Sequence, residues 1–169
     1  MKKLLLCLLL LLSFSTNASS LYCQSLIDQQ LNFNQVVVIK KAFVYGKDKD
    51  LSYSLAAIAW KESSAGKNRF NPNDPSAGVF QIHLDNAIAY NYREDTPSNR
   101  ILVAAELIEN FYISARYAVK NIEFWQRLHG DDWNKIWASY NAGYKYQLGY
   151  SYAEDIKKKI SIIEKCNWS

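Results

Sequence analysis

Apolar residues recur at spacings of three and four over a long stretch of the chain, from position 101 to position 125. That spacing is the repeat of one face of an α-helix, so the stretch predicts one core helix, or two in succession, reaching about Leu128. Thr96 is the expected N-cap and Pro97 the expected first helical residue. The apolar positions are Ile101, Ala105, Ile108, Tyr112, Ala115, Val119, Ile122 and Trp125. A chain built around such helices is expected to be mainly α.

Shorter helical patterns lie on both sides of this stretch. They cover residues 24–31, 35–47, 50–62, 131–140 and 153–164. Asp50 is expected to cap the third of these helices and Asp131 to open the fourth. The run Val36–Ile39 is β-branched, so it could form a strand in place of a helix. No repeat, low-complexity tract or linker interrupts the chain, and residues 19–169 are expected to form a single domain.

Residues 1–18 have the pattern of a secretory signal peptide. Lys2 and Lys3 form a basic start, Leu4–Leu12 is almost uniformly apolar, and Ala18 is a plausible last residue before cleavage. The apolar run is too short for an ordinary membrane-spanning helix, although it could remain as an uncleaved anchor. We therefore expect an exported protein, periplasmic or extracellular.

The net charge and the cysteines give further information on the partners and the compartment of the protein. The net charge of +4 falls to +2 once Lys2 and Lys3 leave with the signal, and no basic stretch interleaved with aromatic residues suggests a nucleic-acid partner. Cys23 and Cys166 lie near the two ends of the mature chain. In an oxidising compartment they could pair and tie those ends together, or they could remain free buried thiols.

Glu62 occupies an unexpected position at the end of an apolar pattern. Leu51, Leu55, Ile58 and Glu62 share one face of a helix, which places a carboxyl group where a buried apolar side chain is expected. Burial disfavours the charged form and raises the pKa, which suits a general acid near neutral pH. Alternatively, the side chain tips out into solvent as the helix ends.

The stretch that follows, residues 63–82, is the most turn-rich in the chain, and long structured loops of this kind often carry function. The sequence contains only two histidines and no HExxH, CxxC, GxSxG, Walker or GxGxxG pattern. We therefore expect no metal and no cofactor. His83 is interpreted as a loop or cleft-wall residue.

Three short blocks follow one another along the chain: Glu62-Ser63, then Ser76–Ile82 (SAGVFQI), then Ala138–Gly143 (ASYNAG). In this order they resemble the lytic transglycosylase SLT domain, which belongs to the soluble lytic transglycosylase and goose-type lysozyme-like family. Tyr152-Ala153-x-x-Ile156 also resembles an element near the C-terminal helix of that family. The resemblance covers roughly residues 50–160. It implies a mainly α, lysozyme-like domain of about six to eight helices around a glycan-binding cleft.

The resemblance also implies an activity. Glu62 would protonate the β-1,4 bond between N-acetylmuramic acid and N-acetylglucosamine, then accept a proton from the muramic acid C6 hydroxyl to give a 1,6-anhydro product. No cofactor is implied, the partner is a peptidoglycan glycan strand, and the protein is expected to be a monomer that could serve a secretion, conjugation or flagellar machine. The implied substrate-binding residues are Ser63, Gly78, Phe80, Gln81, Tyr140, Asn141 and Tyr152.

Two other readings of the sequence stay open. A hydrolytic lysozyme of related fold would use Asp74 or Asp85 to activate a water molecule beside Glu62. A catalytically inactive component of a secretion or conjugation apparatus would bind glycan without cleaving it. The product of the reaction distinguishes the first alternative, and binding without turnover would identify the second.

Overall fold

The computed structural model describes residues 23–71 and 73–168, so the expected signal peptide lies outside the described residues. The described part is mainly helical, with a small antiparallel sheet of order β1-β2-β3. Its elements are α2 (Gln24–Ile27), α3 (Phe33–Tyr45), a 3-10 turn (Lys47–Lys49), α4 (Ser52–Ser63), β1 (Phe70–Asn71), β2 (Ser76–Ala77), β3 (Ile82–His83), α5 (Leu84–Tyr90), α6 (Pro97–Glu109), α7 (Phe111–His129), α8 (Trp133–Ala142), the 3-10 segment η2 (Gly143–Gly149) and α9 (Tyr150–Ile163). Within this part of the chain, none of the helices has the length and apolarity needed to cross a membrane.

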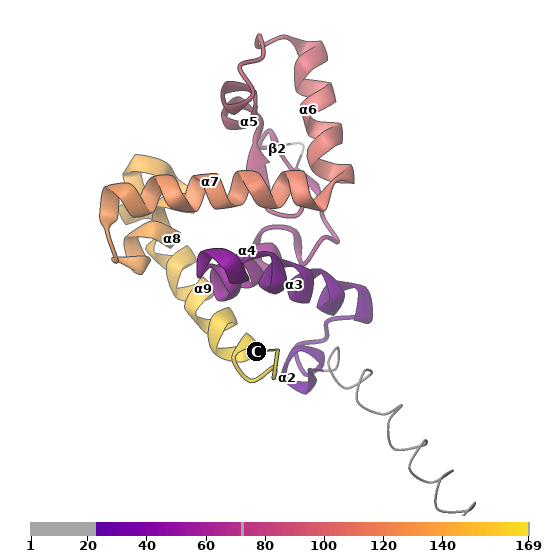
Figure 1. The fold of residues 1–169 in the computed structure, drawn as a ribbon, viewed down its shortest axis with the longest axis vertical. Helices are drawn as coiled ribbons and strands as arrows, with labels where there is room; N and C mark the ends of the chain where they lie inside the picture. Colours follow the sequence, from indigo (N-terminus) through magenta and orange to yellow (C-terminus); the bar gives the residue numbers. More distant parts are fainter. Residues whose placement is uncertain (1–22, 72, 169) are drawn as a thin grey trace, which may run out of the picture.

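Helix α4 lies at the centre of the fold, packed against α3, α9 and α7 (Figure 1). Leu55, Ile58 and the alanines between and beside them are completely buried, because small apolar side chains let neighbouring helices approach on several sides. Leu51 begins the apolar stripe expected from the sequence and is also buried. Glu62 therefore lies in the last turn of a helix that is held firmly by its surroundings.

The long periodic stretch forms two successive helices, α6 and α7. Thr96 is confirmed as the N-cap of α6, since its hydroxyl accepts a hydrogen bond from the Asn99 amide at 3.2 Å, and Pro97 opens the helix. Asn110 separates the two helices by capping α7, where its side-chain oxygen accepts the amides of Tyr112 and Ile113.

Three positions of the expected apolar stripe, Ile101, Ala105 and Tyr112, are exposed and lie outside the core. Ile101 is 70% exposed and Tyr112 is 58% exposed, whereas Val103 and Leu107 carry the buried face of α6. The break at Asn110 changes the direction of the chain, as Figure 1 shows, so one continuous 3.6-residue stripe does not describe both helices.

The Val36–Ile39 run is helical, within α3, so the predicted helix is confirmed here and the strand alternative is not. Three predicted helix starts need correction. Asp50 does not cap α4, because it adopts a left-handed backbone conformation with φ 55°, and the helix begins after Leu51 without a side-chain cap. Asp132, one residue later than expected, caps α8 by accepting the Lys135 amide at 3.1 Å. The last helix begins at Tyr150, three residues earlier than expected.

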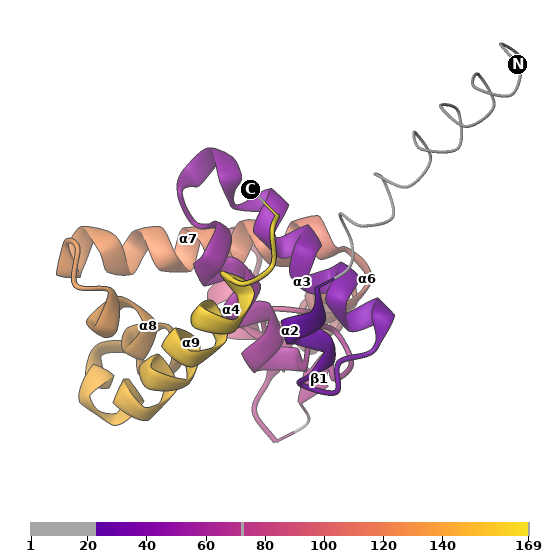
Figure 2. The same ribbon diagram turned by 90° about the horizontal axis from the view of Figure 1, so that it is seen from below.

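Cys23 and Cys166 form a disulfide bond, with their Cα atoms 5.1 Å apart. The bond joins the start of α2 to the segment after α9, which lie side by side in two views of the ribbon (Figures 1 and 2). Beside it, the Ser25 hydroxyl donates a hydrogen bond to the carbonyl oxygen of Ile162 at 2.9 Å. The two ends of the described chain are therefore held together covalently.

Candidate active site

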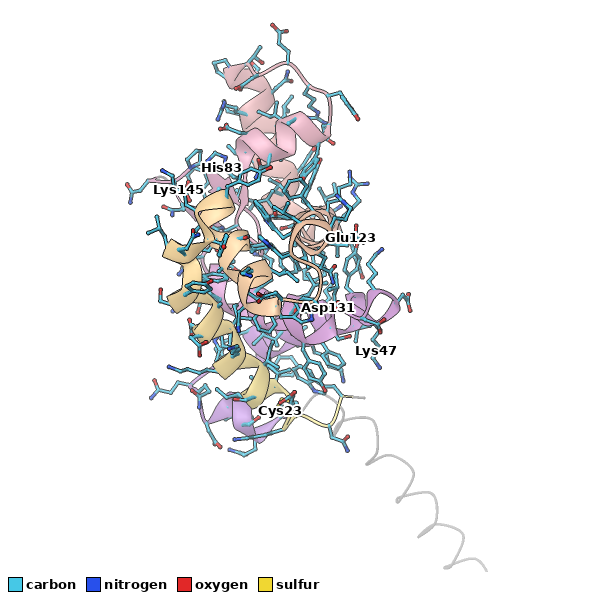
Figure 3. The ribbon with its side chains drawn as sticks, turned by 90° about the vertical axis from the view of Figure 1, so that its left-hand side faces the viewer. Cys23, Lys47, His83, Glu123, Asp131 and Lys145 are labelled. Carbon is cyan, nitrogen blue, oxygen red and sulfur yellow. A yellow bond between two sulfur atoms is a disulfide. The ribbon has the colours of Figure 1, made fainter. Side chains whose placement is uncertain are left out.

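A strongly polar pocket of about 180 Å³ lies where α4 meets the small sheet and the helices α5, α7 and α8. His83, labelled in Figure 3, marks its wall at the base of the lobe that contains α5 and α6. We call this space the polar pocket. Its lining residues are Glu62, Asn71, Asp74, Ser76, Gln81, His83, Asn86, Asn121, Tyr140 and Asn141.

Glu62 contributes the carboxyl group of the polar pocket that is most affected by its surroundings. Desolvation by burial raises the pKa of this carboxyl from 4.5 to about 7. The Tyr152 hydroxyl donates a 2.6 Å hydrogen bond to Oε1 of Glu62, and this bond together with the nearby charge of Lys61 limits the rise. The carboxyl can therefore be protonated at neutral pH and can also give up its proton, as a group that alternates between acid and base must.

Two stacked tyrosines support the pocket from α8 and α9. The rings of Tyr140 and Tyr152 are nearly parallel, with centroids 6.5 Å apart. Burial, followed by the charge of Glu62, raises the pKa of both hydroxyls well above 10, so both remain hydrogen-bond donors. Tyr152 donates to Glu62 and lies outside the pocket lining, so it holds the carboxyl in place, whereas Tyr140 lines the pocket.

Ser63 has a different role from the substrate contact implied by the resemblance. It is fully buried, and its hydroxyl donates to the carbonyl oxygen of Val79 at 2.7 Å while accepting the Gly66 amide at 2.8 Å. Successive residues of a helix point about 100° apart, so Glu62 can face the pocket while Ser63 faces the protein. Ser63 therefore ties the end of α4 to the loop after β2.

Phe80 also faces the interior rather than the pocket wall. Its side chain is fully buried and packs against Phe111, with ring centroids 5.7 Å apart. Its backbone is what connects it to the site, because its carbonyl oxygen accepts a 2.9 Å hydrogen bond from the Tyr140 hydroxyl. The Phe80 side chain therefore does not line the cleft as expected, and it packs in the core instead.

Gly78 is required by packing against α6 and α7 rather than by closeness to Glu62. Its φ is +84°, and an added Cβ would lie 2.5 Å from both the carbonyl oxygen of Leu107 and the hydroxyl of Ser114. Backbone contacts of this kind leave no room for a side chain. The residue lets the loop that carries Gln81 pass directly over the junction of the two helices.

Gly78→Ala is expected to lower the free energy of unfolding by about 1–3 kcal/mol more than the matched change Gly130→Ala. Both glycines have positive φ, but a Cβ at Gly130 meets nothing within 4 Å, whereas a Cβ at Gly78 clashes with Leu107 and Ser114. Urea unfolding of the two variants measures it. Equal unfolding midpoints would show that the loop moves aside without cost.

Gln81 and Asn141 are placed in the polar pocket together with Glu62 and Tyr140. The backbone of Gln81 has φ 44°, a conformation that non-glycine residues adopt at a cost. Its side-chain amide donates to the carbonyl oxygen of Gly78 at 2.9 Å, which fixes its direction. The strained backbone and the hydrogen-bonded amide together hold the Gln81 side chain in a defined position in the wall of the polar pocket.

Three asparagines that line the polar pocket were not predicted from the sequence: Asn71, Asn86 and Asn121. Asn121 carried a usable signal, since asparagine is a poor residue for the middle of a long helix such as α7. Asn71 and Asn86 lie in or just after the small sheet, which the sequence did not reveal. Their position depends on tertiary pairing.

The two aspartates considered for water activation occupy different environments. Asp74 lines the polar pocket, and the Ser76 hydroxyl donates to its carboxylate at 3.3 Å. Asp85 lies outside the lining and forms an ion pair with Arg100 at 2.7 Å. His83 Nε2 lies 3.6 Å from Asp74. Asp74 therefore remains a second carboxylate for the site, and Asp85 does not.

Among the described residues, no three histidine, cysteine, aspartate or glutamate side chains are grouped so that they could hold a metal ion. The residues that meet at the site offer amides, hydroxyls and carboxyls. Such groups hydrogen-bond to the hydroxyl and amide groups of a sugar. The arrangement can donate a proton, accept one and orient a polar ligand.

Comparison with known proteins identifies a relative encoded by a bacteriophage. No protein-family model matches the sequence, and no solved structure matches it. A protein described as an uncharacterized 20.7 kDa protein in the vs-regB intergenic region of Enterobacteria phage T4 is 29% identical over 121 residues, which is 68% of this chain. The matched region spans 63% of the phage protein, less than two thirds of its length.

Proposed function

We propose that this protein is a lytic transglycosylase of the SLT type that cleaves the β-1,4 bond between N-acetylmuramic acid and N-acetylglucosamine in peptidoglycan. The observation that carries the proposal is Glu62, a carboxyl with a pKa of about 7 in a pocket lined by amides and hydroxyls. The order of the blocks around Glu62, Gln81 and Tyr140-Asn141, which meet in that pocket, supports it further. The lysozyme-like cleft is part of the same proposal.

In the proposed reaction the Glu62 carboxyl gives its proton to the glycosidic oxygen as the bond from that oxygen to C1 breaks. The C6 hydroxyl oxygen of the muramic acid then bonds to C1, and its proton passes to the Glu62 carboxylate. The products are a 1,6-anhydro sugar and a new 4-hydroxyl end, and no water is consumed. Tyr152 holds Oε1, which leaves Oε2 available for both transfers.

In the proposed reaction, the amide side chains of the polar pocket orient the sugar. Because the attacking hydroxyl belongs to the substrate, the reaction is intramolecular, and correct placement of the ring supplies much of the rate. Gln81, Asn141 and Asn121 offer both donors and acceptors to the hydroxyl and N-acetyl groups. A single glutamate is then sufficient, unlike the paired carboxyls of ordinary glycosidases.

The proposed setting is outside the cytoplasm. The disulfide between Cys23 and Cys166 is of the kind that persists in oxidising compartments, which agrees with the expected signal peptide at residues 1–18. We propose an exported, monomeric enzyme without a cofactor that acts on glycan strands. We also propose that the enzyme assists a secretion, conjugation or flagellar machine.

A hydrolytic lysozyme is the second candidate, favoured by one observation: Asp74 lines the same pocket as Glu62. In that mechanism Asp74 would activate a water molecule that attacks C1. Transglycosylation needs no such base. The two candidates therefore predict different products from the same bond.

The deciding experiment is mass spectrometry of the muropeptides released from purified peptidoglycan. The proposed function predicts 1,6-anhydro products, each one water lighter than the hydrolysed form. Asp74→Asn is expected to leave that product unchanged. Release of reducing-end sugars alone, lost in Asp74→Asn, would replace the transglycosylase proposal with the hydrolytic one.

A further inference from the structure

Charged side chains join α4 and α9 one helical turn away from the contact between Tyr152 and Glu62. The two helices pack against each other (Figure 1). On α9, Tyr152, Asp155 and Lys159 are spaced by three and four residues, so they share one face of the helix. That face meets the last turn of α4, which carries Lys61 and Glu62.

Asp155 binds two lysines at once. Its Oδ2 lies 2.6 Å from Nζ of Lys61, and its Oδ1 lies 2.7 Å from Nζ of Lys159. Burial would raise the pKa of Asp155, but the hydrogen bonds from both lysines outweigh it, so the pKa lies below its usual value and the carboxylate stays charged. Lys159 also lies over the ring of Trp60, 5.0 Å from its centroid, which holds the network against α4.

Lys61 links this network to the candidate active site. Its Nζ lies 5.8 Å from the centroid of the Tyr152 ring, whose hydroxyl donates the 2.6 Å hydrogen bond to Glu62. Burial favours the protonated form of Glu62, and the positive charge of Lys61 opposes that effect. The Lys61 side chain is 38% exposed, so without a fixed partner its charge would move in solvent and be screened. Asp155 supplies that partner.

The other groups around Glu62 do not supply a fixed positive charge. Tyr140 of α8 keeps its proton, because burial raises its pKa well above 10. Asp74, between β1 and β2, raises the pKa of Glu62 by its negative charge, and His83 of β3 lies 3.6 Å from Asp74. Helix α7 contributes Asn121 to the pocket lining, and this side chain does not titrate.

We propose that Lys61 is a positioning residue for the reaction at Glu62, held by Asp155 so that its ammonium charge stays near the carboxyl that gives and takes the proton. The inference rests on the proposed function for that proton transfer. In this role Lys61 stabilises the carboxylate that remains after Glu62 has protonated the glycosidic oxygen. Without the charge, Glu62 would keep its proton to a higher pH and give it up less readily.

The pH profile of peptidoglycan lysis tests this role. Lysis should decrease on the alkaline side as Glu62 loses its proton. Lys61→Gln removes the charge but can still donate to Asp155, and it should move the alkaline limb upward by roughly half a pH unit, the size expected of one partly exposed charge. Lys61→Arg keeps the charge and should keep the wild-type profile. Lys157→Gln is the matched control, because Lys157 is similarly exposed and forms an ion pair with Glu154 on α9 at 2.9 Å, and it should leave the limb in place.

A second pair of variants tests the role of Asp155. In an Asp155→Asn background Lys61 has no carboxylate to hold it. Adding Lys61→Gln to that background should therefore move the alkaline limb by less than it does in the wild type. A shift of the same size in both backgrounds would show that Asp155 does not position Lys61.

The outcomes separate this role from the proposed function. The Glu62 carboxyl can be titrated by ¹³C NMR without substrate, and Lys61→Gln should raise its pKa. Activity that falls at every pH, with an unmoved limb and an unchanged Glu62 pKa, would make Lys61 a merely structural residue and overturn the inference. If the wild type lyses no peptidoglycan while Lys61→Gln still raises the pKa of Glu62, the proposed function fails and the charge coupling stands.

Discussion

Glu62→Gln is expected to lower the lysis of purified peptidoglycan by about 10²–10⁴-fold, the usual contribution of a general acid. Glutamine keeps the shape of the side chain and can still accept the Tyr152 hydrogen bond, but it has no proton to give to the glycosidic oxygen. The decrease in turbidity of a peptidoglycan suspension measures lysis. Glu123→Gln is the control, because Glu123 lies on α7, forms an ion pair with Lys49 at 3.7 Å and does not line the polar pocket around Glu62.

The same substitution should stabilise the fold at high pH. The pKa of Glu62 is about 7 in the folded protein and near 4.5 in the unfolded chain, so the folded state binds more protons between these values. Stability attributable to this group therefore falls as the pH rises from 4.5 to 7 and stays lowered above. Glu62→Gln removes that penalty, up to about 3 kcal/mol above pH 7, with little difference below pH 4.

Two results would contradict this role of Glu62. Retained lysis by a folded Glu62→Gln variant would place the acid elsewhere. A stability difference between variant and wild type that does not change with pH would show that the carboxyl is not held in a desolvated position. The two readouts are independent, because the second requires no substrate.

Removal of the disulfide is expected to have the largest effect on stability. The Cys23→Ala/Cys166→Ala variant should lose about 2–5 kcal/mol of unfolding free energy, because the bond closes a loop with a sequence separation of 143 residues and restricts the unfolded chain. Urea unfolding of the variant and of the oxidised wild type measures the loss. The bond does not line the polar pocket, so activity at low temperature should persist.

Reduction of the wild-type protein is the control for this prediction. Dithiothreitol should shift the wild-type unfolding midpoint toward that of the double variant and leave the variant unchanged. If the reduced and oxidised proteins unfold at the same urea concentration, the disulfide contributes nothing measurable to stability.

The features that the sequence predicted correctly depend on local interactions. Thr96 and Pro97 marked a helix start because the cap and the restricted proline act within one turn. The position of Glu62 after Leu51, Leu55 and Ile58 followed from helical period alone. The prediction that Asp50 caps α4 was wrong, because close packing determines the path of the chain between α3 and α4. A Cβ on Gly46 would lie 2.6 Å from the backbone of Ser52.

The features that were missed depend on contacts between distant segments. The two-residue strands β1, β2 and β3 are too short to show a period, and they exist because they pair with one another. The roles of Ser63 and Phe80 were also beyond sequence reasoning. Each is adjacent to a residue that faces the pocket, and only the fold shows which of the two neighbours points inward.

The carboxyl titration of Glu62, followed by ¹³C NMR of the folded protein, tests most directly its proposed role as acid and base. A pKa of about 7 is expected, and a higher pKa in Tyr152→Phe, because the Tyr152 hydrogen bond lowers it. Tyr150→Phe, which changes an exposed tyrosine two residues earlier on α9, should leave it unchanged. A wild-type Glu62 that titrates near 4.5 would be charged at neutral pH and could not serve there as the general acid.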